Sequence, residues 1–366
     1  MRISKPVRIF IAWLLIMVLA NSLMTFVFEP HAGSAEVMWT DFRKEKNLDT
    51  VFVGPSLCMQ SFNPYIYNDL TGQSSFNMAT VGQPMEATRA AVREALKEDS
   101  IHTVVLGIGF YDLGDTKSKN AEFAFYRGLR NASDHPVLTD LEFVLSPDHF
   151  GKEESINYLF PWVFNHTKYV KDNIKFKLAG KSMLDDGWLN GTNRTYIGKG
   201  FLSITAEIPD GADMNDTSWN IYPNHDFSDR TMGVLDDIIA MCQEKGVDLI
   251  VVNTPHPPYD VLSYGKNGEY FALEDRLSAY LAEKGVDYYN FSLLKPEYAV
   301  FDRSCFEDFE HVNDTGARRF TKAFVDVLQA KAAGQDVSEM FYHTESDYRA
   351  SFVNPDALSF DMERVE

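Results

Sequence analysis

Cysteine is scarce in this sequence of 366 residues: there are only three, Cys58, Cys242 and Cys305, and they lie far apart. An odd number at wide spacing excludes a disulfide framework, so we expect at least one free, buried thiol. No two of them form a Cys-x-x-Cys pair, and no spacing of Cys and His is typical of a zinc site. We therefore expect neither a metal nor a cofactor.

Positive charge is also in short supply, because 34 Lys and Arg residues stand against 53 Asp and Glu, for a formal net charge of −19. Binding to nucleic acid or to anionic lipid through charge requires a basic patch, and no run of Lys and Arg provides one. Nucleic acid is therefore excluded as a partner. With 45% hydrophobic residues, the chain can form one large domain or two modest ones with a full core.

The N-terminus contains a charge-free apolar stretch from Ile9 to about Phe28, preceded by Arg2, Lys5 and Arg8. About 20 apolar residues span a bilayer, which predicts a transmembrane helix over 9–28 after a cytoplasmic segment 1–8. The positive-inside rule places everything after Glu29 outside the cytoplasm. The alternative is a cleaved signal peptide, whose apolar core is usually only about 7–15 residues long. Either way, the rest of the protein works outside the cytoplasm.

From about residue 47, strand-like and helix-like segments alternate. Short apolar or aromatic runs over 49–54, 102–109, 247–255 and 286–292 are typical of strands buried on both faces. Helical spacing of apolar residues appears between them, over 84–99, 233–246 and 275–285, and again from Asp314 to Ala330. The alternation predicts an α/β fold with a parallel sheet between two layers of helices, over residues 47–330. A linker, 29–46, would precede it, and a C-terminal tail, 331–366, would pack along its surface.

The interval 115–229 does not follow this alternation and is rich in aromatic residues, Asn and Gly. It is predicted to be an insertion at the functional edge of the sheet. Its Trp162, Trp188 and Trp219 could stack on sugars or pack the insertion's own small core. His166 in the insertion and His256 after a predicted strand could line a substrate cleft, or each could be an ordinary loop histidine.

Ser56 follows the first predicted strand in the block Gly54-Pro55-Ser56-Leu57. Ligands of open parallel sheets bind beyond the carboxyl ends of the strands, so this serine is well placed for chemistry. A serine there is also an ordinary helix N-cap. A second block favours chemistry: Asp308 and His311 are three residues apart and share a face of a helical turn. The carboxylate can then hold the imidazole Nδ1–H while Nε2 faces a serine.

These two blocks resemble those of the SGNH/GDSL hydrolase superfamily, which places a serine in a Gly-Asp-Ser-Leu-like block after the first strand and Asp-x-x-His near the C-terminus. The resemblance implies a flavodoxin-like α/β/α fold and a catalytic triad of Ser56, His311 and Asp308. It also implies an oxyanion hole formed by the Ser56 N–H, Gly82 and a third block. Here the third block reads "GIGFYDLGD", which offers Gly107 but no Asn, and Pro55 replaces the family's Asp.

The chain looks most similar to the membrane-anchored bacterial branch of this superfamily, which includes alginate O-acetylation proteins and the D-alanyl-lipoteichoic acid transfer protein. That resemblance implies an O-acyltransferase or esterase anchored in the bacterial cell membrane. A cell-surface glycan or cell-wall polymer would be its substrate, and a multispanning membrane acyltransferase its partner. Pro55 and the missing Asn leave open an alternative, a catalytically inactive SGNH-like protein for glycan binding or assembly.

Overall fold

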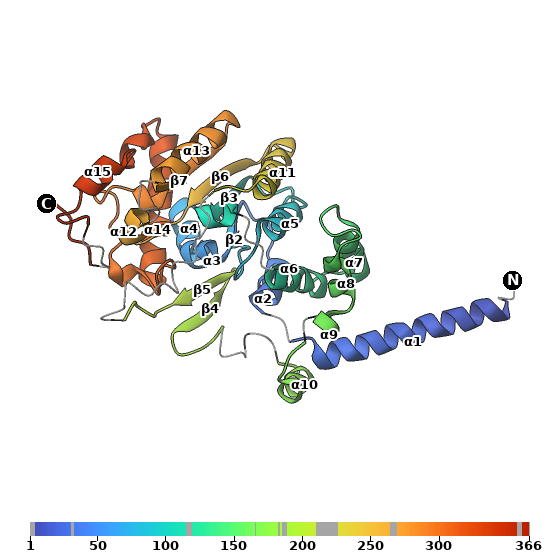
Figure 1. Ribbon diagram of the computed structural model, residues 1–366. Helices are drawn as coiled ribbons and strands as arrows, with labels where there is room; N and C mark the ends of the chain where they lie inside the picture. The colour runs from blue at the N-terminus through green and yellow to red at the C-terminus, as the bar shows by residue number, and fades with distance from the viewer. Residues whose placement is uncertain are drawn as a thin grey trace.

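The computed structural model describes residues 4–30, 33–114, 119–164, 166–181, 184, 189–209, 226–263, 269–356 and 361–365. Helix α1 (Lys5–Phe28) projects away from the rest of the protein and buries none of its residues (Figure 1). Pro6 lies in its first turn, where a missing N–H costs no hydrogen bond. By length and composition α1 could cross a membrane, and a signal sequence would pass the same test.

Five parallel strands form the central sheet in the order β2-β1-β3-β6-β7. Their bounds are β1 (Thr50–Val53), β2 (Ser75–Asn77), β3 (Thr103–Ile108), β6 (Asp248–Asn253) and β7 (Asp287–Asn290). The chain order reverses between β1 and β3, which is the topological switch point where doubly wound sheets bind ligands. The sequence predicts four of the five strands; β2 is only three residues long and lies at the edge.

Helices cover both faces of the sheet, so the predicted three-layer α/β/α architecture is confirmed. Successive side chains of β1 point to opposite faces: Val51 and Val53 join one core cluster, and Phe52 joins the other. The first cluster includes side chains of α2 (Ser34–Phe42), α5 (Met85–Ala95), α11 (Asp229–Lys245) and α13 (Glu269–Glu283). The second includes side chains of α3 (Ser56–Ser61), α4 (Pro64–Thr71) and α14 (Asp314–Ala332).

Helices and a hairpin fill the segment between β3 and α11. The helices are η1 (Phe110–Leu113), α6 (Lys119–Asn131), α7 (Pro136–Leu145), α8 (Glu153–Leu159), α9 (Pro161–Phe164) and α10 (Val170–Leu178). The antiparallel hairpin joins β4 (Arg194–Gly198) to β5 (Phe201–Ile204). Its Gly200 has φ +76°, and a Cβ there would lie 1.7 Å from the carbonyl oxygen of Asn77. Only glycine therefore lets the hairpin approach β2 so closely.

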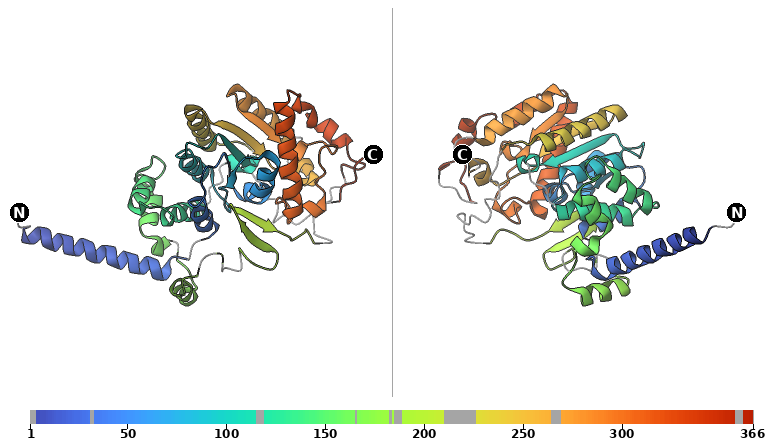
Figure 2. Two further views of the ribbon diagram at one scale, coloured as in Figure 1. Left: turned by 180° about the vertical axis from the view of Figure 1, so that it is seen from behind. Right: turned by 45° about the vertical axis from the view of Figure 1, so that its right-hand side comes forward.

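The remaining short elements lie at the C-terminal side of the sheet and in the C-terminal region. They are α12 (Pro258–Ser263), η4 (Phe291–Leu293), η5 (Arg303–Cys305), η6 (Val337–Met340) and α15 (Glu345–Ala350). The C-terminal region is anchored to the domain, because Phe341 pairs with Leu294 and the side chain of Tyr348 is buried. Figure 2 shows this region and α1 on opposite sides of the molecule.

Candidate active site

Ser56 is the first residue of α3, three positions after β1 ends at Val53. The chain turns at Gly54, where φ is +149° and a Cβ would lie 2.1 Å from the carbonyl oxygen of Gly107. This close approach requires glycine. The turn places Ser56 at the carboxyl edge of the sheet, beside the switch point between β1 and β3.

Three side chains from distant parts of the chain form a hydrogen-bonded series at this edge. The Oγ of Ser56 lies 2.8 Å from Nε2 of His311, and Nδ1 of His311 lies 3.0 Å from both carboxylate oxygens of Asp308. Backbone N–H groups of Glu310 and His311 also donate to Asp308 Oδ1, at 3.0 and 2.8 Å. With Nδ1–H donated to the carboxylate, Nε2 is free to accept the serine proton.

Electrostatics suit His311 to the role of a base. Burial works against its protonation, but the hydrogen bond and charge of Asp308 outweigh burial and raise the pKa of His311 above its ordinary value. Burial likewise opposes ionisation of Asp308, yet the bonds from His311 and the backbone keep the pKa of this carboxyl below its usual range. The pair therefore favours a charged Asp308 that stabilises the imidazolium formed when His311 takes a proton.

A cavity of about 250 Å³ opens beside Ser56. It is lined by residues at or beyond the carboxyl ends of β1, β2, β3 and β6, including Ser56, Gly82, Gly109, Asp112, Asn253 and His256, and by Glu310. Among the described residues that line it, three are carboxylic acids and none is Lys or Arg. Burial raises the pKa of Asp112 to about 7, against the opposing effect of the Gly109 N–H.

The glycines expected in the oxyanion hole lie in different surroundings. Gly82 lines the cavity and has φ +59°, whereas Gly107 is not among the lining residues. Gly107 lies within β3, where its missing Cβ leaves room for Cys58, since a Cβ there would be 2.9 Å from the Cβ of that cysteine. The next candidate, the N–H of Gly109, already donates to Asp112 Oδ2 at 2.8 Å.

His256, which the sequence offers either as a residue of a substrate cleft or as an ordinary loop histidine, lines this cavity. It is only 8% exposed, and its Nδ1 lies 2.9 Å from Asp260 Oδ2. Burial opposes its protonation, but Asp260 outweighs burial and raises the pKa of His256. Among the residues the structure describes, its Nε2 has no hydrogen-bond partner. That nitrogen lies over Gly109, 3.8 Å from where a Cβ would be.

The remaining candidates lie elsewhere. Trp162 and His166 are not among the residues that line the cavity; the Trp162 indole donates to Asn21 of α1 at 2.6 Å, and His166 is exposed. Trp188 and Trp219 lie outside the described residues. Cys58 is fully buried behind Ser56, and burial raises the pKa of its thiol, so it is not a competing nucleophile.

A second Ser–His–carboxylate series lies between α6 and α8 and is invisible in the sequence. Ser146 Oγ lies 2.8 Å from Nδ1 of His149, whose Nε2 lies 2.9 Å from Glu122 Oε1. His149 is fully buried and its ring stacks on Phe143 with centroids 3.9 Å apart. This series is part of a packed core.

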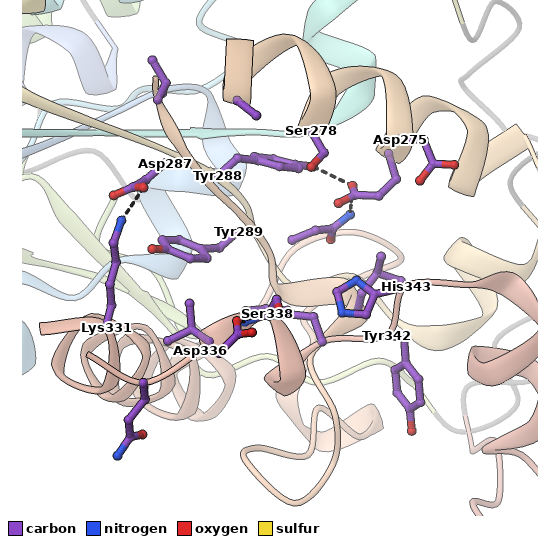
Figure 3. Close-up of a pocket in the computed structure, with 18 of the residues that line it drawn as sticks. Asp275, Ser278, Asp287, Tyr288, Tyr289, Lys331, Asp336, Ser338, Tyr342 and His343 are labelled. Atoms are coloured by element: carbon purple, nitrogen blue, oxygen red, sulfur yellow. Dashed lines mark hydrogen bonds and ion pairs between the residues drawn. The ribbon is translucent and has the colours of Figure 1, made fainter. Parts of the chain in front are cut away.

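A larger hollow of about 610 Å³ lies along β7, between α13 and the end of α14 (Figure 3). Several of its polar groups are paired with one another: Lys331 binds Asp287, and Tyr288 Oη donates to Glu274 at 2.7 Å. The residues that line it include no member of the Ser56 series. The smaller cavity at Ser56 is therefore the candidate active site. Among the residues described, no group of three or more His, Cys, Asp or Glu side chains is arranged to hold a metal ion.

Comparison with known proteins finds likenesses among solved structures. No protein-family model matches the sequence, and no curated protein matches it. Among solved structures, the chain is similar to a crystal structure titled a "putative acylhydrolase" from Bacteroides fragilis NCTC 9343. The two share 10% sequence identity with a TM-score of 0.34, over 77% of this chain and 87% of the other. At that TM-score the likeness carries no weight for function, which rests on the geometry around Ser56.

Proposed function

We propose that the protein is a serine-dependent acyl-transfer enzyme of the SGNH type. The observation that carries this proposal is the series Ser56–His311–Asp308 beside a cavity at the switch point of the sheet. Such a series activates a serine hydroxyl that is otherwise a weak nucleophile.

In the first half of the reaction, Ser56 Oγ bonds to the acyl carbonyl carbon while His311 Nε2 takes its proton. The tetrahedral intermediate then expels the donor's alkoxide, which receives that proton from His311, and the acyl group stays on Ser56. In the second half, His311 takes a proton from an acceptor hydroxyl or water, whose oxygen bonds to the acyl carbon. The new ester or acid leaves, and His311 returns the proton to Ser56.

The developing oxyanion needs hydrogen-bond donors, each worth about 10²–10³ in rate. The N–H of Ser56, as the first of a helix, has no partner within α3, and Gly82 lines the same cavity. His256 is the donor that replaces the family's Asn, because its unpaired Nε2 lies over Gly109 in this cavity. Asp260 lies 2.9 Å from Nδ1 of His256 and raises the pKa of this histidine. Asp260 therefore favours the imidazolium form, in which Nε2 also carries a proton that it can donate to the oxyanion.

The cavity also limits the acyl group. About 250 Å³ suits a small group, and the carboxyl groups of Asp112, Asp260 and Glu310 favour a neutral or positively charged one over an anion. With α1 as a membrane anchor, the acceptor is a hydroxyl of a cell-surface glycan or cell-wall polymer outside the cytoplasm. A multispanning membrane acyltransferase supplies the acyl group. These last assignments rest on the resemblance of the sequence to the membrane-anchored SGNH branch.

Trapping the acyl-enzyme tests the proposal. Purified protein is mixed with an aryl acetate, quenched in acid and analysed by peptide mass spectrometry. We expect one acetyl group on Ser56, lost in Ser56→Ala and formed far more slowly in His311→Ala, because His311 takes the Ser56 proton during acylation. A folded protein that never acquires the acetyl group at Ser56 would support the alternative, a non-catalytic glycan-binding or assembly protein.

A further inference from the structure

Helices α7 and α8 leave large apolar side chains uncovered. We call this set the collar: Val137, Leu138, Leu141, Leu145, Phe150 and Ile156, each between 47% and 67% exposed. Leu138, Leu141 and Leu145 recur at helical spacing on one face of α7, while Thr139 and Phe143 on the other face are buried. Large apolar side chains exposed together on neighbouring helices usually mark a binding surface.

The collar is connected to α1 through packed helices. α7 packs against α8, α8 against α9, and α9 against α1. Figure 1 and the left view of Figure 2 both show α7, α8 and α9 on the side of the domain from which α1 projects. Whatever surrounds α1 near this contact therefore also lies close to the collar.

Asn21 is the residue of α1 through which the helix bonds to the segment 159–162. Its Nδ2 donates to the carbonyl oxygen of Leu159 at 2.9 Å, and its Oδ1 accepts from the indole of Trp162 at 2.6 Å. Amide groups in lipid must find partners within the protein, and these two bonds satisfy both ends of the side chain. Trp162 is also the residue type that favours the interface between lipid and water.

Charges mark where α1 leaves the apolar layer. Glu29, just after α1, pairs with Arg127 at 2.7 Å, and Lys177 Nζ lies 2.9 Å from the carbonyl oxygen of Phe26. Asn21 lies seven residues before Phe28, which is about 10 Å along a helix. The uncharged stretch 9–28 is about as long as the apolar layer of a membrane is thick. Leu159 and Trp162, the partners of Asn21, would therefore lie deeper in that layer than Glu29 does. Amphipathic helices at a membrane surface bury their apolar face to a similar depth, about 5–10 Å.

We propose that the collar is inserted into the outer leaflet of the membrane that α1 spans, so that lipid covers it. This inference rests on the proposed role of α1 as a retained anchor. Glu142 and Lys152, which are exposed near the collar, lie at the level of the head groups, so α7 runs along the surface and not through the bilayer. The attachment is apolar, because the chain has a large excess of acidic residues. A second attachment beside α1 restricts the tilt of the domain, and so holds the Ser56 cavity at a defined height above the membrane.

Fluorescence quenching in nanodiscs tests this inference with the full chain. Single cysteines are introduced by Leu138→Cys and Leu141→Cys, and by Val353→Cys as a control, since Val353 is 58% exposed. Val353 precedes the C-terminus, which lies on the side of the molecule opposite to α1 (Figure 1). Each is labelled with an environment-sensitive fluorophore. The natural Cys58, Cys242 and Cys305 are buried, which protects them from labelling. The protein is then placed in phosphatidylcholine nanodiscs that contain a lipid with a nitroxide on its acyl chain, close to the head group.

We expect the nitroxide lipid to quench the labels at 138 and 141 severalfold more than the label at 353, and aqueous iodide to show the reverse order. Leu138→Glu combined with Leu145→Glu should expose the label at 141 to iodide, while Leu70→Glu, at another exposed leucine, should not. Equal iodide quenching at 141 and 353 would overturn the proposal. Protection of the label from both quenchers would also overturn it, because a second copy of the chain would then cover the collar. Acetylation of Ser56 is measured on the same samples, so loss of activity and loss of lipid contact are scored separately.

Discussion

The two Ser–His–carboxylate series have nearly equal distances and opposite surroundings. At the sheet edge, Ser56, His311 and Asp308 border a cavity, and the serine lies on Nε2 of the imidazole. Between α6 and α8, Ser146 lies on Nδ1 of His149, and the ring is enclosed by packing against Phe143. Ser146 Oγ also donates to the carbonyl oxygen of Phe143 at 3.0 Å.

The difference teaches that a hydrogen-bonded series of this kind does not by itself make an active site. The series at Ser146 satisfies buried polar groups and connects helices, which is the usual reason for such bonds. The series at Ser56 has bonds of similar length and, in addition, room for a substrate and a histidine in that cavity, His256, whose Nε2 is unpaired among the described residues. Substitutions in one series should therefore change turnover, and substitutions in the other should change stability.

The largest effect is expected from Ser56→Ala and His311→Ala. Each should lower kcat for an aryl acetate by about 10⁶-fold, and the double variant should be no slower than either, because the two residues act as a unit. Ser146→Ala is the matched control and should leave kcat unchanged. A working Ser56→Ala variant, or one no slower than Ser146→Ala, would contradict the assignment. Steady-state kinetics of the wild type, the two single variants and the double variant, combined in a double-mutant cycle, measures these effects.

Asp308→Asn should cost less, about 10⁴-fold in kcat, because Asp308 orients and stabilises the imidazolium without moving a proton itself. Its unfolding midpoint in urea should stay close to that of the wild type, since the amide keeps the same shape. A loss as large as that of His311→Ala would indicate that Asp308 does more than hold the ring.

His256→Ala should lower kcat by about 10²–10³-fold with little change in KM, because an oxyanion donor acts mainly in the transition state. His256→Asn restores a side-chain N–H and should recover part of the rate. If His256 were only a packing residue, both variants would be equally slow and equally destabilised. His166→Ala, at an exposed histidine away from the cavity, controls for general effects.

The pH dependence should separate the groups of the site. Because Asp308 raises the pKa of His311, the base stays protonated to higher pH, and kcat/KM should fall as pH drops through a midpoint above 6.5, the ordinary value for histidine. Asp308→Asn should move this midpoint down. Burial raises the pKa of Asp112 to about 7, so this carboxyl also titrates near neutral pH. The fall in kcat/KM at low pH, which is the acid limb of the profile, should therefore persist in Asp112→Asn if His311 is its source. A limb that disappears in Asp112→Asn would reassign the base.

The smallest effect on turnover, and the largest on stability, is expected from His149→Ala. Removing the imidazole breaks the buried pair between His149 and Glu122, which is only 1% exposed, and breaking such a pair typically costs about 3–5 kcal/mol. The free energy of unfolding in urea measures this loss, and kcat of the folded fraction should remain near that of the wild type. A stable His149→Ala variant would show that this series contributes little to the core.

Strong local patterns made much of the fold predictable. Apolar runs identify β1, β3, β6 and β7, since strands buried on both faces carry continuous apolar side chains. The same patterns give Ser56, His311 and Asp308, because the end of the first strand and an Asp-x-x-His block point to one sheet edge. The short edge strand β2 and the hairpin β4–β5 lack such a pattern, so tertiary contacts decide them.

Other features depend on long-range packing that no local pattern reveals. The buried series at His149 forms only when α6, α7 and α8 pack together. Trp162 is of the residue type that stacks on sugars, but its indole N–H donates to Asn21 of α1, 141 residues away in the sequence. His256 gains its significance from the Gly109 N–H being occupied by Asp112, which only the structure shows.

The most direct test of the account is the rate at which a fluorophosphonate probe labels folded protein. The same base that activates Ser56 for acyl transfer activates it for the probe. The account predicts one labelled residue, Ser56, with labelling abolished in Ser56→Ala, strongly slowed in His311→Ala and unchanged in Ser146→Ala. Folded wild-type protein that stays unlabelled, or labelling that persists at the wild-type rate in His311→Ala, would contradict it.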